Sequence, residues 1–373
     1  MRIELTELDT ANFLVKPYIF YGEQVFLVIP NHIGCEWTPE NRHFRSSVWN
    51  LKGELVSASF PKFFNWGEKP AITPPPQTLE DARLVEKIDG SALIISKYKG
   101  NFMVRTRRTI DARGMEKNGD EVEILLTKYP AIKELYPDWE TWTFSLIFEW
   151  VSPRNQIVIR YTEPDLFLVG AVNHGGDMVT VDYELWTQDS LDKLALELGV
   201  KRPQIFNFSH VQDMLLAISE LQGQEGLCVY FKHGQEILKV KSAWYLVLHR
   251  MKSELSNIDG VIDLYFSTEQ KDMAPLSHDE FYGYICRTFD YELAEMVRGH
   301  VSKMFDAIKE SQQIVFHMRH FVEPLKKLSR KDAAQKIIGA YGKTNRSGFA
   351  FTLLDGKDLT IEQRKKLIYQ TLK

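Results

Sequence analysis

The sequence predicts an α+β protein in which an antiparallel-sheet domain is followed by an all-helical domain. Three observations lead to this fold class. Strand-like runs separated by turn residues continue to about residue 245, helical periodicity follows them, and a chain of 373 residues is long enough for two domains. We place the domains at residues 1–245 and 246–373. Hydrophobic residues make up 44% of the chain, which is typical of folded globular proteins.

The first part of the chain, residues 1 to about 80, alternates short apolar runs with joints rich in proline and glycine. The runs at 25–29, 48–49 and 55–60 are expected to be strands. The segment 70–76, PAITPPP, is expected to be a loop, because each proline fixes φ and lacks an N–H donor.

Two β-hairpins are predicted in the rest of the first domain. The first covers 84–108 and turns at Lys99-Gly100-Asn101, while the second joins 226–232 to 236–242. In the second arm of the first hairpin, alternation along a strand would place Arg105 and Arg107 on one face. Further strands are expected at 142–151, 157–161 and 166–172, and short helices at 190–198 and 210–221.

From about Trp244 the pattern becomes helical. Ser277 and Glu280 have the spacing of a helix capping box, and apolar residues between 293 and 308 recur every three or four positions. Residues 322–373 contain 12 Lys and Arg against 5 Asp and Glu, although the whole chain has a net charge of −4. This basic segment indicates a polyanionic partner, but solvated lysines on a helical surface explain it equally well.

The cysteines and the N-terminal residues argue against several classes of protein. Cys35, Cys228 and Cys286 are scattered and accompany no histidine cluster, so neither a disulfide framework nor a zinc site is indicated. No apolar signal segment and no run of about 18 apolar residues occurs. We therefore expect a soluble, cytoplasmic protein without a membrane partner, and a monomer.

Five charged residues in strand-like surroundings are the candidates for chemistry. Lys87 lies in EKIDGS, where the ordinary interpretation is a surface lysine before a turn. Glu149 interrupts an apolar strand, and Glu225 precedes another one. Lys239 and Lys241 share one strand face, as lysines that protect a solvated edge strand also do.

Taken together, these residues predict a nucleotide pocket. The amine of Lys87 could attack a phosphorus atom if nearby cations lower its pKa. The candidate cations are Lys239, Lys241, Arg105 and Arg107, which would also neutralise a transferring phosphate. Asp89, Glu149 and Glu225 supply oxygen ligands suited to hydrated Mg²⁺, and Gly90 would let the backbone approach a ligand closely.

In this order, the segments EKIDGS, FEW, EG and LKVKS resemble motifs I, III, IV and V of the ATP-dependent nucleotidyltransferases, which include DNA ligases, RNA ligases and mRNA capping enzymes. The segments 44–49, 60–65, 148–153 and 239–245 resemble the bacteriophage RNA ligase 1 family in particular. The resemblance covers roughly residues 40 to 250. Helical sequence follows Trp244 where DNA ligases and capping enzymes have an OB-fold, which also favours this branch.

The resemblance implies a nucleotidyltransferase (adenylylation) domain and an ATP-dependent RNA ligase. Such an enzyme joins RNA 5′-phosphate and 3′-hydroxyl ends through lysyl-AMP and RNA-adenylate intermediates. It implies ATP and Mg²⁺, or Mn²⁺ in its place, as cofactors. Lys87 would be the nucleophile that carries AMP.

The remaining roles also follow from the resemblance. Arg45, Lys62 and Phe64 would belong to the pocket that the nucleotide and the RNA 5′-phosphate approach, with Phe64 against the adenine. Glu86 would help to recognise adenine, and Gly90 and Gly226 would lie beside the nucleotide. Asp89, Glu149 and Glu225 would hold the water shell of Mg²⁺ or the ribose. Lys239 and Lys241 would contact the phosphates, with Lys241 at the α-phosphate. Arg105 and Arg107 stand where the family has lysines, and Ser46 stands where it usually has glycine.

For the partner, the resemblance suggests RNA, with repair of cleaved tRNA as the implied task and the helical domain selecting the RNA. If a phage encodes the chain, its location would be the host cytoplasm. Three alternatives remain open: a ligase for DNA, a polynucleotide adenylyltransferase that stops after RNA-adenylate, and a non-catalytic RNA-binding protein on the same scaffold.

Overall fold

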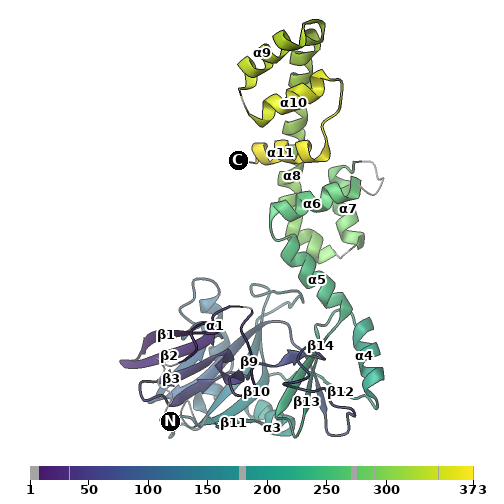
Figure 1. Cartoon of the computed structure of the whole chain (residues 1–373). Coiled ribbons are helices and arrows are strands. Elements are labelled where there is room, and N and C mark those ends of the chain that lie inside the picture. The colour runs from purple at the N-terminus through teal and green to yellow at the C-terminus, as the bar shows by residue number, and fades with distance from the viewer. Residues whose placement is uncertain are drawn as a thin grey trace. The chain divides into compact units, whose positions relative to one another are not determined.

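The computed structural model describes residues 8–32, 34–175, 182–269, 275–288, 291–342 and 344–372 (Figure 1). The chain divides into two compact units, Met1–Val247 and Leu248–Lys373. The first is built on antiparallel sheets and the second is helical, which confirms the predicted α+β class. Among the described residues, no helix combines the length and the apolar character needed to cross a membrane.

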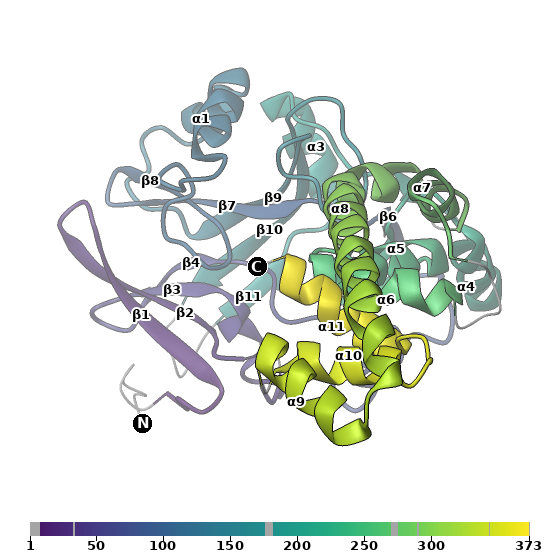
Figure 2. The ribbon, with the colours of Figure 1, turned by 90° about the horizontal axis from the view of Figure 1, so that it is seen from above.

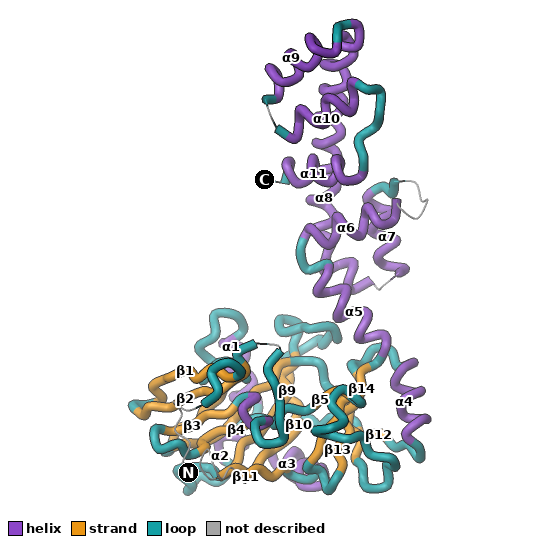
Figure 3. Tube along the Cα trace, in the orientation of Figure 1, coloured by secondary structure: helices purple, strands orange, loops and turns teal. Residues whose placement is uncertain are grey.

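In its described part, the first unit contains three sheets (Figure 3). The first sheet is antiparallel and has the strand order β1-β2-β3-β4. Its strands are β1 (Phe13–Phe20), β2 (Glu23–Pro30), β3 (Ser47–Asn50) and β4 (Leu55–Ala58). The short 3₁₀ helix η2 (Arg42–Arg45) leads into β3.

The second sheet has the order β11-β10-β9-β7-β8 and contains residues 91–105 of the first predicted hairpin, whereas residues 84–86 of that prediction belong to a strand of the third sheet. Its strands are β7 (Ser91–Tyr98), β8 (Asn101–Arg105), β9 (Phe144–Val151), β10 (Asp165–Gly175) and β11 (Asp182–Leu185). Lys99 and Gly100 connect β7 to β8 with φ of 49° and 77°. Positive φ at both positions is what a tight two-residue hairpin turn requires.

The third sheet has the order β12-β6-β13-β14-β5. Its strands are β5 (Phe64–Asn65), β6 (Arg83–Glu86), β12 (Ile205–Phe206), β13 (Gly226–Phe231) and β14 (Glu236–Lys241). The pair β13–β14 is the second predicted hairpin, which is thereby confirmed. Because β6 pairs with β13, the residue that follows β6 lies beside the start of that hairpin.

Helices pack against the second and third sheets of the first unit. They are α1 (Gly119–Lys128), α2 (Ala131–Glu134), α3 (Gln188–Leu198) and α4 (Val211–Glu220), of which α1, α3 and α4 can be followed in Figure 2. The second sheet shares one apolar core with α1, α2 and α3, in which Leu125 and Leu191 pack with Phe148. The third sheet shares another core with α4, through Met214 and Ile218. Burial of these apolar side chains fixes the sheets that carry the site.

The second unit is organised around α8 (Tyr291–Val322). The other helices of the C-terminal part are α5 (Ala243–Glu254), α6 (Ile258–Glu269), α7 (His278–Thr288), η3 (Glu323–Lys327), α9 (Arg330–Tyr341), α10 (Asn345–Leu354) and α11 (Ile361–Thr371). The capping box at α7 is confirmed, since Ser277 N donates to Glu280 Oε2 at 2.8 Å and Glu280 N donates to Ser277 Oγ at 3.4 Å. Phe349 is 3% exposed, so it belongs to the core of this unit.

The secondary-structure prediction missed several elements, among them β1 and α1, and assigned one segment wrongly. The prediction did not include β1, whose run FLVKPYIF is interrupted by Lys16 and Pro17. Proline is tolerated there because β1 lies at the edge of its sheet. Residues 157–161 were expected to be a strand, but they form none. The backbone N–H groups of Val158 and Ile159 instead donate to the carboxylate of Asp89.

Candidate active site

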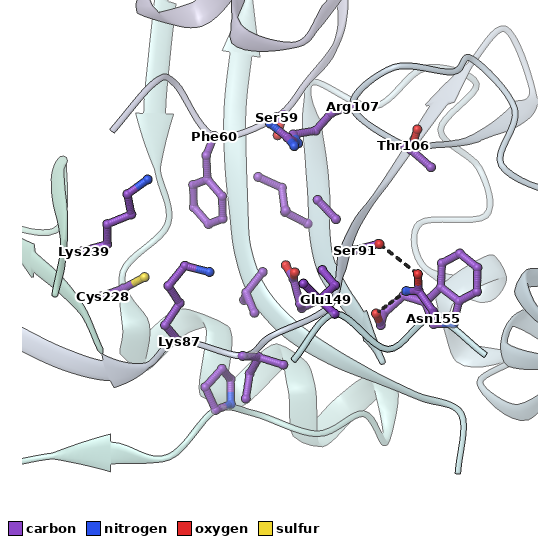
Figure 4. A pocket seen from close by; sticks show the side chains of 18 of the residues that line it. Ser59, Phe60, Lys87, Ser91, Thr106, Arg107, Glu149, Asn155, Cys228 and Lys239 are labelled. Carbon is purple, nitrogen blue, oxygen red and sulfur yellow. Dashed lines mark hydrogen bonds between the residues drawn. The ribbon is translucent and has the colours of Figure 1, made fainter. Parts of the chain in front are cut away.

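A cavity of about 700 Å³ in the first unit gathers most of the predicted site residues (Figure 4). Lys87 enters it from the end of β6, and Lys239 and Lys241 enter it from β14. Glu149 reaches it from β9, and Arg107 from the loop after β8. The third sheet thus supplies the three lysines, and the second sheet supplies a carboxylate opposite them.

The backbone of Lys87 is held by Gly226. The Lys87 N–H donates to the Gly226 carbonyl at 2.8 Å. Gly226 has φ of +144°, and a Cβ there would lie 2.0 Å from the Val240 carbonyl oxygen. Only glycine meets both conditions without strain. Gly226 does not line the cavity and supports the backbone of Lys87, so its contact with a nucleotide stays a prediction.

The side chain of Lys87 is held by Glu225. The Lys87 ammonium lies 2.7 Å from Glu225 Oε2, and the Lys241 ammonium lies 2.8 Å from Glu225 Oε1. Burial works against the charge of Lys87, but Glu225 and Glu149 outweigh it and raise the pKa of Lys87. The prediction that neighbouring cations lower this pKa is therefore wrong. Lys87 is therefore held in its ammonium form by Glu225 and Glu149.

The lowered pKa belongs to Lys239. Burial, followed by the nearby cations Arg45, Lys62 and Lys241, lowers the pKa of Lys239 to about 8. The shared face of Lys239 and Lys241 is confirmed, since both line the cavity. A cluster of cations this dense is unfavourable unless an anion joins it, and a phosphate group is the natural candidate.

Arg45 and Lys62 lie around this cluster in different ways. Arg45 lines the cavity, and its guanidinium carbon lies 4.6 Å from the centroid of the Phe63 ring. Burial, then Arg107, lowers the pKa of Arg45. Lys62 does not line the cavity: its ammonium lies 5.1 Å from the centroid of the Phe64 ring. Direct contact of Lys62 with a nucleotide is therefore not supported by its position.

Glu149 is the acidic group that faces the lysines. Burial raises its pKa to about 7, with Lys87 opposing this shift and Glu225 adding to it. No described residue donates a hydrogen bond to its carboxylate. Near neutral pH the group therefore changes readily between its charged and neutral forms, and a cation placed beside it would favour the charged form.

Asp89 does not face the cavity, which corrects its prediction as a metal or ribose ligand. It is 2% exposed, and its Oδ2 accepts from the N–H groups of Val158 and Ile159, both at 2.7 Å. Its Oδ1 accepts from the Tyr245 hydroxyl at 2.8 Å. Both oxygens are therefore engaged, and Asp89 ties the segment that follows Lys87 to the loop after β9 and to α5.

The predicted three-carboxylate metal site is not assembled. Among the described residues, no group of three Asp, Glu, His or Cys side chains is placed to hold a metal ion. Asp89 is satisfied by backbone and tyrosine donors, and Glu225 by two lysines. Of the three predicted ligands, Glu149 alone presents its carboxylate to the cavity. One carboxylate still suits Mg²⁺, which commonly binds through one or two carboxylates, substrate phosphates and waters.

The aromatic residues that line the cavity are Phe60, Phe63, Trp150 and Tyr230, and the prediction of Phe64 against adenine is wrong. Phe64 is 1% exposed and packs in the core of the third sheet. The ring of Phe60 points into the cavity (Figure 4). Gly170 makes room for it, since a Cβ at Gly170 would lie 2.2 Å from Phe60 Cζ. The segment 60–65 contains several phenylalanines, and the sequence alone did not show which of them is buried.

Gly90 and Glu86 border the cavity on either side of Lys87. A Cβ at Gly90 would lie 2.4 Å from the Trp150 carbonyl oxygen, so glycine is required there by the approach of β9 rather than by a ligand. Glu86 accepts from Gln224 Nε2 at 3.2 Å, and burial raises the pKa of Glu86. Its place on the wall is compatible with a contact to a base.

Arg105 faces away from the cavity, so the prediction that it shares a face with Arg107 is wrong. β8 ends at Arg105, and the turn that follows interrupts the alternation of side chains. Arg105 is fully buried, and its Nε donates to Ser57 Oγ at 2.8 Å and its Nη1 to Ser46 Oγ at 2.6 Å. Ser46 Oγ in turn donates to the Arg107 carbonyl at 3.0 Å. Arg105 and Ser46 therefore fix the backbone from which Arg107 enters the cavity.

Several residues that line the cavity were not among the predicted ones. They include Phe60, Ser91, Arg108, Lys117, Arg154, Asn155 and Cys228. Cys228 lies opposite Lys239 in the β13–β14 pairing, and burial raises the pKa of its thiol to about 11. Alternation along β13 could have placed Cys228 in the cavity. The others lie in or beside loops, whose course the sequence does not specify.

Known proteins resemble the chain over the segment that carries this cavity. A family model described as RNA ligase matches residues 43–254, which is more than half of the chain. The chain is 26% identical over 284 residues to an RNA ligase of Rhodothermus phage RM378, covering 61% of this chain and 63% of that protein. It is 28% identical over 226 residues to a putative RNA ligase of Thermovibrio ammonificans, covering 59% and 56%. The chain thus spans less than two thirds of the length of both relatives.

Among solved structures, an archaeal ATP-dependent RNA ligase is 14% identical with a TM-score of 0.46, covering 80% of this chain and 76% of that one. The segment that the family model matches includes Lys87, Glu149, Glu225 and both lysines of β14. By that match, the chain belongs to the RNA ligase family.

Proposed function

We propose that the protein is an ATP-dependent RNA ligase that uses Lys87 as its nucleophile. The observation that carries this proposal is the arrangement of one amine, Lys87, with Glu225 and the lysines of β14 in a cavity of about 700 Å³. That volume lies within the range of sites that bind nucleotide-sized ligands. Membership of the RNA ligase family supports the choice of RNA as the substrate.

In the first step, Lys87 Nζ attacks the α-phosphorus of ATP. The N–P bond forms, the bond from the α-phosphorus to the bridging oxygen breaks, and pyrophosphate leaves. The ammonium must lose one proton before the attack, and Glu225 Oε2 lies 2.7 Å away as an acceptor. The nitrogen loses a second proton, to solvent, as the N–P bond forms. Lys239 and Lys241 stabilise the negative charge that grows on the phosphate oxygens and on the leaving group.

In the second step, an oxygen of the RNA 5′-phosphate attacks the same phosphorus, the N–P bond breaks, and the amine of Lys87 regains its proton. In the third step, the RNA 3′-hydroxyl loses its proton and attacks the RNA phosphorus, and AMP leaves. Arg45 and Arg107 lie on the cavity wall, where they would hold the phosphates of the two substrates. We propose broken tRNA as the natural substrate from the family resemblance, with the helical unit selecting it.

A divalent metal fits beside Glu149. This carboxylate faces the cavity without a described donor, and its pKa of about 7 leaves it ready to be ionised by a cation. Bound there with phosphate oxygens and waters, Mg²⁺ would neutralise charge on the triphosphate and orient it.

The test is transfer of label from α-labelled ATP to the protein. We expect label that remains on the denatured protein, is lost in Lys87→Ala, and persists in Lys69→Ala, where the lysine is exposed outside the cavity. A folded protein that takes up no label would refute the proposal and favour a non-catalytic RNA-binding protein. Offering 5′-phosphorylated single strands of RNA and of DNA, and measuring circles, separates an RNA ligase from a DNA ligase. Product that stops at the adenylated strand would indicate an adenylyltransferase.

A further inference from the structure

The end of the cavity away from Lys87 has a wall of its own. Two loops converge there: the connection between β8 and α1, residues 106–118, and the loop after β9. In Figure 4, Arg107, Thr106 and Asn155 lie on this side of Glu149, while Lys87 and Lys239 lie on the other. We call this end the basic lobe and define it by Arg107, Arg108, Lys117, Asn118, Arg154 and Asn155.

The loops of the basic lobe are tied to one another and to the second sheet. Asn118 Nδ2 donates to the Arg154 carbonyl at 3.0 Å, and Arg154 pairs with Asp120 at 2.8 Å. Asn155 Nδ2 donates to the Trp150 carbonyl at 3.0 Å, and its Oδ1 accepts from Ser91 Oγ at 3.1 Å. The cations therefore stand on a fixed framework rather than on independent surface loops.

The charge of the cavity exceeds what one nucleotide requires. Among the described residues that line it, eight are Lys or Arg, and Glu86 and Glu149 are acidic. Glu225 lies just behind this lining and pairs with both Lys87 and Lys241. Four of the eight cations lie at the Lys87 end: Lys87 itself, Arg45, Lys239 and Lys241. A triphosphate bound with Mg²⁺ carries only about two net negative charges, given that the ion neutralises two. Of the other four, which belong to the basic lobe, Arg154 is already paired with Asp120. Arg107, Arg108 and Lys117 form no ion pair with a described residue and are left for a second anion.

The apolar wall of the cavity indicates where the adenosine lies. Phe60, Val85, Ile147, Val169 and Pro203 line the cavity together with Lys87, and they are suited to a base. An adenosine in the basic lobe would place its neutral base and sugar against four cations. The nucleotide is therefore better accommodated at the Lys87 end, beside Phe60.

We propose that the basic lobe binds the phosphate backbone of the RNA strand that carries the 5′-phosphate, over the nucleotides next to its end. The inference rests on the proposed function and adds the place where that strand lies. It fits the reaction, because the 5′-phosphate must reach the phosphorus held at Lys87 while the rest of the strand leaves the cavity. Cations that meet successive phosphates give affinity without regard to base sequence.

The test uses Arg108→Ser combined with Lys117→Ser, two exposed positions that do not touch Lys87. The matched control is Lys133→Ser with Lys193→Ser, which removes two exposed cations elsewhere on the same unit. For each protein we would measure KM for ATP in lysyl-AMP formation. We would then charge the protein with AMP and measure single-turnover transfer to a 5′-phosphorylated RNA oligonucleotide at several salt concentrations.

In the Arg108/Lys117 variant we expect KM for ATP to stay within about twofold and KM for RNA to rise roughly tenfold. The slope of log affinity against log salt should fall by about 1.4, at about 0.7 for each lost phosphate contact. The control should match wild type in both assays, and Arg108→Lys with Lys117→Arg should restore RNA binding, since the charge is kept.

Two results would overturn the inference. An unchanged KM and salt slope for RNA would show that the lobe does not hold the strand. A raised KM for ATP in lysyl-AMP formation would show that the lobe holds the triphosphate tail instead. Failure of the proposed function looks different, because the wild-type protein itself would then form no lysyl-AMP.

Discussion

The pKa of Lys239 leads to a pH dependence that differs between substrate binding and chemistry. Burial and the surrounding cations lower this pKa from its ordinary 10.5 to about 8. The ammonium, which attracts phosphate, is therefore the main form below pH 8 and the minor form above it. Between about pH 7 and about pH 9 the charged fraction falls roughly tenfold, because each unit above the pKa divides it by ten.

If the charged form alone binds the triphosphate, KM for ATP should rise up to about tenfold over that interval. The rate at saturating ATP should move the other way, since the pKa of Lys87 is raised and its amine is freed as pH increases. Phosphate beside Lys239 also raises its pKa again, so ATP binding above pH 8 should take up a proton from the buffer.

The assay is lysyl-AMP formation at a series of ATP concentrations and pH values, for wild type and Lys239→Arg. Arginine keeps its charge throughout this range, so the rise of KM centred near pH 8 should disappear in the variant. Lys193→Arg, at an exposed position, serves as the control and should keep it. Proton uptake is measured by calorimetry in buffers that differ in ionisation enthalpy. If the inflection persisted in Lys239→Arg, a different group would be responsible and the reasoning would be refuted.

Phe60→Ala should raise KM for ATP and lower the unfolding free energy less than Phe64→Ala does, because the Phe60 ring is only partly buried. Phe64→Ala should cost about 3–5 kcal/mol of stability, measured by urea denaturation. Equal losses of stability in both would contradict their assignment. Lysyl-AMP formation should fall below about pH 7 as Glu149 is protonated, and a pH–rate profile of Glu149→Gln should lack this limb. Gly226→Ala should lower the free energy of unfolding by about 2–5 kcal/mol, because alanine is strained at φ of +144° and its Cβ would contact β14 too closely. A change under about 0.5 kcal/mol in denaturant unfolding would disprove the backbone argument.

The sequence was most informative where the periodicity was local. Alternation along β14 correctly placed Lys239 and Lys241 on one face, because both lie within a single regular strand. The same rule failed for Arg105 and Arg107, since β8 ends between them and the second residue follows a turn. Periodicity predicts orientation only as far as the element continues, and sequence alone locates that end poorly.

The second source of error was the assignment of ligand contacts to residues that have a structural role. Asp89 and Gly226 lie in segments that resemble nucleotidyltransferase motifs, and we therefore predicted that each contacts a ligand. In the fold, the Asp89 carboxylate is occupied by distant backbone donors and a tyrosine, and Gly226 makes room for β14. Which acceptor meets which donor is decided by long-range contacts. Residues around Lys87 could therefore be named from the sequence, while their division into ligand contacts and supports could not.

Two consecutive residues hold Lys87, the proposed nucleophile, by its side chain and by its backbone. Glu225 holds the amine of Lys87 at 2.7 Å, and Gly226 holds its backbone amide at 2.8 Å. When the amine becomes bonded to phosphorus it ceases to be a cation, so its ion pair with Glu225 is lost. The backbone hydrogen bond from Lys87 to Gly226 remains. Glu225 is then left to Lys241 alone. The mobility of the short connection between α4 and β13 should therefore depend on whether Lys87 carries AMP. Amide hydrogen exchange in this connection should distinguish the adenylylated protein from the free protein in the absence of RNA.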